Sequence, residues 1–172
     1  MRGPEIGETA PNFDLSSTEG VLLMLRDECV HTALVLYLFP AIDDRAQRDL
    51  ADLARVQKAL AYLRTQLFGL SKAPLKQLQS LQRELGLVFP LLHDDRAFLA
   101  AYGVNAQAEG PASEPALYMV DSTETVIWKA NPIASVEAAL PDLLAKAKKL
   151  PSASAGYPKK VINRVVDWWV GR

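Results

Sequence analysis

The chain has 172 residues, 49% of them hydrophobic and 23% charged, which is enough to bury one sizeable core in a single domain. A formal net charge of -1 gives no general attraction to nucleic acid, so the composition argues against a nucleic-acid-binding protein. The single cysteine, Cys29, excludes an internal disulfide and a thiol-rich metal site, and it predicts a reducing, cytoplasmic location. No run approaches the roughly 18 apolar residues of a membrane span, and no apolar run follows the first residues, so we expect neither membrane insertion nor secretion.

The first strong pattern is an apolar run over residues 32–39 that is rich in Val, Leu and aromatic residues and stops at Pro40. Such a run is typical of a strand buried on both faces, and we expect it to be the central strand of a sheet. Asp43 or Asp44 can cap the next helix. Because leucines recur at helical spacing, we expect this helix to continue to about Gln66.

Strands and helices then alternate along the chain. Residues 67–70 form a second short apolar run, and residues 74–85 predict a helix that Gly86 can terminate. The later pattern predicts a strand over 90–93, a short helix over 94–102 closed by Gly103, a hairpin of strands over 116–120 and 125–129, and a helix over 135–150. This order favours an α/β sandwich, a central mixed sheet flanked by helices.

The C-terminal part of the sequence is set apart from this pattern. Residues 1–150 form the predicted domain, residues 151–158 predict a linker rich in Pro, Ser, Ala and Gly, and residues 159–172 predict an appended amphipathic helix. Because exposed tryptophan is unfavourable, we expect the apolar side of this helix to dock on the protein's own core or on a second copy. Contact with a protein partner or a membrane surface is the alternative. The residues concerned are Val161, Ile162, Val165, Val166, Trp168 and Trp169, with Lys159, Lys160 and Arg164 on the basic side.

Five stretches of the sequence carry a joint signal: GETAPNF (7–13), LVLYLFP (34–40), LFGLS (67–71), LGLVFPLLHD (85–94) with YGV (102–104), and PALYMVD (115–121). In this order and spacing they resemble the peroxiredoxins of the alkyl hydroperoxide reductase and thiol-specific antioxidant family. The resemblance spans about residues 5–145 and is more specific than any one fragment. It implies a thioredoxin-like fold and, since members of the family commonly assemble as dimers or rings, a homo-oligomer.

The resemblance fails at the family's active-site motif. In the family, the proline that ends the central strand opens a P-x-x-x-T-x-x-C motif, and here that stretch reads PAIDDRAQ (40–47). Pro40 is retained, but the threonine position falls on Asp44, the peroxidatic cysteine on Gln47, and the family's arginine before a late strand near Pro115. Peroxide reduction needs a thiolate of low pKa, which a glutamine amide cannot supply. The resemblance therefore implies a degenerate member without the peroxidatic cysteine.

Cys29 cannot take the place of the missing cysteine by a shift of the alignment. It precedes the central strand, and the length of that strand separates it from the motif by on the order of 20 Å. Its neighbour His31 leaves an activated thiol open, although a structural cysteine is the simpler interpretation.

Arg45 and Arg48 have both a functional and a structural interpretation. Arg45 and Arg48 could form an anion site at the start of the long helix, but pairing with Asp49 and Asp52 on a solvated face is simpler. Pro115 lies where thioredoxin-like folds often hold a cis-proline.

His93 with Asp94 and Asp95 could be a metal site, but no further His or Cys lies nearby in sequence, so we predict neither a metal nor a cofactor. We predict a peroxiredoxin-like protein with a non-enzymatic binding or scaffolding role. A thiol-dependent antioxidant activity through Cys29, and an anchor to a membrane surface or a complex through the C-terminal helix, remain the alternatives.

Overall fold

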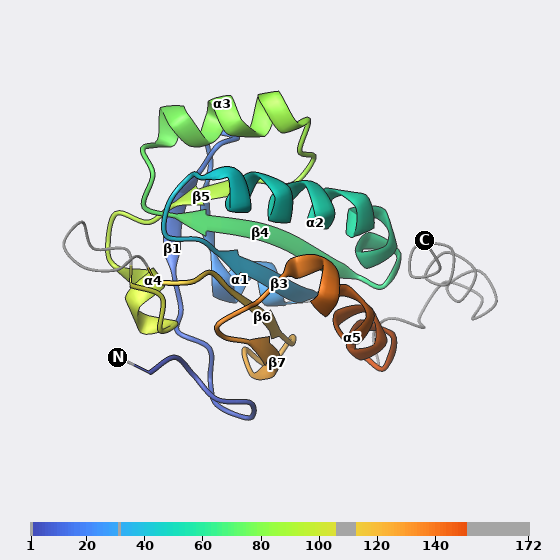
Figure 1. Cartoon of the computed structure of the whole chain (residues 1–172). Coiled ribbons are helices and arrows are strands. Elements are labelled where there is room, and N and C mark those ends of the chain that lie inside the picture. Colours follow the sequence, from blue (N-terminus) through green and yellow to red (C-terminus); the bar gives the residue numbers. More distant parts are fainter. Residues whose placement is uncertain (1, 31, 106–112, 151–172) are drawn as a thin grey trace.

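The computed structural model describes residues 2–30, 32–105 and 113–150, which form one mixed sheet with helices on both faces (Figure 1). The strand order is β2-β1-β5-β4-β3-β6-β7; β4 is parallel to both β3 and β5, and the other pairs are antiparallel. The predicted α/β sandwich is confirmed. The strands are β1 (Asp14–Ser17), β2 (Leu22–Met24), β3 (Ala33–Leu38), β4 (Thr65–Ser71), β5 (Leu91–His93), β6 (Ala116–Val120) and β7 (Val126–Ala130). The helices are α1 (Leu25–Cys29), α2 (Asp44–Tyr62), α3 (Leu75–Leu85), α4 (Phe98–Ala101) and α5 (Val136–Lys148).

Strand β3 is central, as predicted, and every one of its residues is buried. Successive side chains of a strand point to opposite faces, so its apolar run fills two cores. Val35 and Tyr37 belong to the core that α2, α3 and α5 cover. Leu34 and Leu36 belong to the core on the other face, which α1, α4 and the N-terminal segment cover.

Helix α2 ends earlier than the sequence pattern predicts. Its last residue is Tyr62, whereas the leucine spacing predicted an end near Gln66. Arg64 has a φ of 51°, in the left-handed region that terminates helices. Thr65 then opens β4 beside Ala33 of β3, so pairing with the central strand prevails over helical periodicity.

The remaining elements follow the prediction with two exceptions. Helix α3 ends at Leu85, and Gly86 follows with a φ of 61°, as expected of a left-handed residue that terminates a helix. The helix predicted over 94–102 contracts to the four residues of α4, because the carboxylate of Asp94 accepts the backbone N–H groups of Phe98 and Leu99 and so starts the helix later. Elements β1, β2 and α1 were not predicted; each has five residues or fewer, too short for a period to be read.

The predicted linker at 151–158 and the predicted helix at 159–172 lie outside the described residues, as do the contact residues assigned to that helix. After α5 the chain leaves the described core at the end of the sheet where α2 ends and β4 begins (Figure 1). In the part of the chain that the structure describes, no helix is long and apolar enough to cross a membrane.

Candidate functional site

The stretch 40–47 covers the turn after β3 and the first turn of α2. Asp43 is the cap of α2: its Oδ1 accepts the backbone N–H of Ala46 at 2.7 Å. Asp44 follows as the first residue of the helix, and both carboxylates are exposed. The partial positive charge of a helix N-terminus favours an anion, and here side-chain carboxylates already occupy that end. A thiolate or other anion added at this turn would meet like charge.

A hollow of 150 Å³ opens beside this turn. The residue at the family's cysteine position, Gln47, does not line it. Gln47 instead lines a wider hollow of 410 Å³ between α2 and α3, together with Lys76 and Ser80. The smaller hollow is lined by Tyr37, Phe39, Pro40, Ala41, Asp43, Arg45, Ala46, Ser113, Glu114 and Pro115.

The wall of the small hollow holds a buried polar network that the sequence analysis missed. The Tyr37 hydroxyl donates to Oδ2 of Asp49 at 2.8 Å, and the backbone N–H of Val136 donates to Oδ1 of the same carboxylate at 3.5 Å. Arg45 lies beside it, with Nε 3.8 Å from Oδ2 of Asp49. Burial, and then the neighbouring Asp49 carboxylate, raise the pKa of Tyr37, so its phenol stays protonated. The network ties β3, α2 and the start of α5 together.

The predicted anion site at Arg45 and Arg48 is not assembled as a free pair of cations. The Arg45 guanidinium donates to the backbone carbonyls of Ile133 and Ala134 and lies 3.8 Å from a carboxylate oxygen of Glu114. Its charge is therefore matched by Asp49 and Glu114, and its donors serve the fold. The simpler prediction is confirmed for the pair of Arg45 with Asp49. It is wrong on the setting, because Asp49 is buried at 5% exposure rather than solvated, and on Asp52, which pairs with Arg55.

The peptide bond before Pro115, at the position where thioredoxin-like folds often hold a cis-proline, is not cis. In the described residues the cis bond is that between Asn131 and Pro132. The carbonyl of Pro115 accepts the backbone N–H of Ile133 at 2.9 Å, which places these two loops side by side.

The only thiol of the chain lies far from this turn. Cys29 ends α1, at the opposite end of β3, whose six residues span about 20 Å. The residue is 1% exposed and packs in the core that α1 and α4 cover. Burial, and then the carboxylates of Glu124, Asp121 and Glu28, raise the pKa of the thiol from 9.0 to about 12. Its neighbour His31 lies outside the described residues.

The candidate metal ligands serve the fold as well. The ring Nδ1 of His93 lies 2.9 Å from the carbonyl oxygen of Ala73, and the Asp94 carboxylate accepts the backbone N–H of Leu99 at 2.9 Å. Asp95 lies 3.9 Å from the Arg96 guanidinium. Among the residues that the structure describes, no group of three or more His, Cys, Asp or Glu side chains could hold a metal ion.

The model of the AhpC/TSA family matches residues 6–129. Peroxiredoxin bcp of Coxiella burnetii is 31% identical over 102 residues, which are 58% of this chain and 67% of that protein.

Solved structures agree on the fold. Peroxidoxin BcpB from Mycobacterium tuberculosis superposes with a TM-score of 0.76 at 20% identity, over 84% of this chain and 97% of that one. Peroxiredoxin Q of Xanthomonas campestris gives a TM-score of 0.69 at 20% identity, over 79% of this chain and 89% of that one. The thioredoxin-like fold predicted from the sequence is thereby confirmed.

Proposed function

Because this chain belongs to the AhpC/TSA family, we propose that it has kept the fold of the peroxiredoxins and acts by binding another molecule rather than by reducing peroxide. A thiol peroxidase needs an accessible cysteine that ionises near neutral pH. Gln47 stands where the family motif has its cysteine, and the carboxylates of Asp43 and Asp44 surround the start of the helix.

The observation that carries the proposal is the state of Cys29. It is the one sulfhydryl in the sequence, it is buried, and its pKa is raised to about 12. At neutral pH only a minute fraction of such a thiol is ionised, and the residue is 1% exposed. Desolvation and three carboxylates act in the same direction, so the environment protects the thiol from reaction.

In this proposal the protein is cytoplasmic and works as a homo-oligomer or in a complex. The single cysteine of the sequence, which excludes an internal disulfide, supports a reducing compartment. The assembly of other family members supports self-association, and the predicted C-terminal helix offers a second contact.

Peroxide consumption by the purified full-length chain, with dithiothreitol or thioredoxin as reductant, tests the proposal. We expect no turnover above the protein-free rate in the wild type and in Cys29→Ser. A thiol peroxidase assayed in parallel shows that the assay responds. Turnover in the wild type that Cys29→Ser abolishes would overturn the proposal and establish the antioxidant alternative.

Gln47→Cys, made in a Cys29→Ser background, separates the two reasons for inactivity. If the carboxylates at the helix start oppose a thiolate, this variant stays inactive, while adding Asp43→Asn and Asp44→Asn raises the reactivity of the new thiol toward an alkylating reagent. Equal reactivity with and without the two carboxylates would show that their charge is irrelevant.

A further inference from the structure

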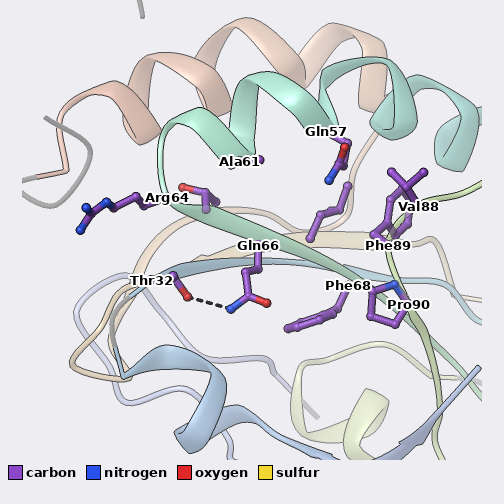
Figure 2. A pocket seen from close by; sticks show the side chains of 11 residues that line it. Thr32, Gln57, Ala61, Arg64, Gln66, Phe68, Val88, Phe89 and Pro90 are labelled. Carbon is purple, nitrogen blue, oxygen red and sulfur yellow. Dashed lines mark hydrogen bonds between the residues drawn. The ribbon is translucent and has the colours of Figure 1, made fainter. Parts of the chain in front are cut away.

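A hollow of 330 Å³ lies at the end of the sheet opposite to the α2 N-terminus (Figure 2). It follows the first part of β4 on the side away from β3, where no other described strand pairs with it. β5 pairs with β4 only from Gly69 onward, so residues 65–68 form an open sheet edge on that side. Proteins usually cover such an edge with a helix or a loop, because its backbone groups would otherwise attract another chain.

The hollow is apolar in its floor and on part of its rim. Leu67, Phe68 and Phe89 form buried apolar walls, while Ala61 of α2 and Val88 stand exposed at the rim. Val88 is 68% exposed, the largest value among the exposed large hydrophobic residues of the described chain. Val88 lies on the loop between α3 and β5, and its exposed side chain is available to contact a segment that covers the hollow.

Two more exposed apolar side chains lie close in sequence to residues that line the hollow. Tyr62 follows Ala61 at the end of α2, and Val30 comes two residues before Thr32. Exposed apolar side chains that gather on one surface mark an interaction site, whereas single ones need no explanation.

We propose that the apolar face of residues 159–170 of the same chain covers this hollow. The sequence places Val161, Ile162, Val165, Val166 and Trp169 on one side of the predicted helix. The apolar side of this helix and the apolar rim of the hollow would both be exposed to water if nothing covered them. The docking does not depend on whether the protein reduces peroxide.

The point of exit and the chain length allow this docking. Val136, the first residue of α5, donates to Asp49 near the start of α2, and α5 runs from there toward the end of α2 (Figure 1). The chain thus leaves α5 at the end of the sheet that holds the hollow. A linker of eight residues reaches about 26–29 Å when extended, and a helix of twelve residues is about 18 Å long.

The chemistry of the hollow suits tryptophan. A space of 330 Å³ is at the lower end of the range of about 300–1,000 Å³ that accepts compact organic groups, which fits one indole with an aliphatic neighbour. A buried indole N–H needs an acceptor. Gln57 and Gln66 line the hollow, and Figure 2 shows both side chains at its wall, where their amide oxygens can accept that N–H.

The emission of the tail tryptophans tests the docking in the full-length chain. In a Trp128→Phe background, Trp168 and Trp169 are the remaining tryptophans. We expect emission at the short wavelengths of a buried indole, and a shift to longer wavelength in Val88→Glu. The matched control is Val21→Glu, which changes a 50% exposed valine beside the edge strand β2 and should leave the emission unchanged.

The stability of the variants gives a second readout. Val88→Glu should lower the urea midpoint of the full chain, and this effect should disappear when Trp169→Ala is already present, because coupled residues do not add. Unchanged emission in Val88→Glu would overturn the proposal. Short-wavelength emission that is lost on dilution, or gained only with phosphatidylserine vesicles, would also overturn it, in favour of a second copy or a membrane surface.

Discussion

At the scale of single residues, a buried polar network around Asp49 joins β3, α2 and the start of α5. Asp49 is 5% exposed, and its carboxylate accepts hydrogen bonds from the Tyr37 hydroxyl and from a backbone N–H of α5. The Arg45 guanidinium lies beside it. Arg45 in turn donates hydrogen bonds to two backbone carbonyls of the loop before α5. A buried carboxylate with these partners stabilises the fold only while the partners stay in place.

Replacing Asp49 should therefore be costly. Asp49→Ala leaves the Tyr37 hydroxyl without its acceptor and the Arg45 charge short of a partner, so we expect a loss of about 2–4 kcal/mol in the free energy of unfolding. Asp49→Asn keeps an acceptor oxygen and should lose less. Urea denaturation measures both.

Asp52→Ala is the matched control on the same helix. Asp52 pairs with Arg55, whose side chain is half exposed, and such pairs contribute about 1 kcal/mol or less. If Asp49→Ala and Asp52→Ala cost the same, the buried network adds nothing to stability beyond an ordinary surface pair.

The Cys29 thiol makes a pH-dependent contribution to stability whose sign follows from its raised pKa. In the unfolded chain the thiol ionises near its ordinary value of 9.0, and in the folded chain only near about 12. Between these values the unfolded state binds fewer protons, so this contribution is complete below pH 9 and is lost as the pH rises toward 12.

We expect Cys29→Ala to be less stable than the wild type at pH 7, by about 1 kcal/mol for the lost packing. This difference should shrink as the pH rises above 9, since only the wild type carries the thiol. Urea midpoints of both proteins from pH 7 to pH 10.5 measure it. A difference that stays constant over this range would mean that the thiol ionises equally well in the folded state.

At the scale of elements, the sequence predicted those whose signal is local and long. The central strand β3, helix α3 with its Gly86 terminus, and the hairpin of β6 and β7 have strong apolar patterns or a characteristic end residue. Elements β1, β2 and α1 have too few residues for a pattern. Their structure comes from the pairing of β2 with β1 and of β1 with β5, and from the core. The end of α2 was missed because β3 pairs with the residues that follow it.

The candidate site shows the same division between local and distant information. The cap at Asp43 and the Gln47 substitution can be read from a short stretch of sequence. The contact of Tyr37 with Asp49 joins a strand to a helix, and the contacts of Arg45 reach residues 133–134, which no local pattern reveals. Tyr37 and Asp49 lie twelve positions apart, a spacing that is characteristic of no single element.

At the scale of the whole molecule, the two cores share the strands that separate them. In β3, β6 and the later part of β4, alternate side chains belong to one core and to the other. If one core unfolds, the shared strands lose the side-chain contacts on one of their two faces. We therefore expect residues 1–150 to unfold in a single cooperative step, even though β7 lies at the sheet edge.

Trp128 is the one tryptophan of residues 1–150, and it lies on β7, packed against the core that α2, α3 and α5 cover. Its fluorescence therefore reports the edge of the sheet, while far-ultraviolet circular dichroism reports mainly the helices. For the chain 1–150 we expect both signals to give the same urea midpoint, because β7 is held to β6, and β6 to the buried strand β3. A Trp128 transition at lower urea than the loss of helix would show that β7 detaches first, and that the sheet edge is a separate unit despite the shared strands.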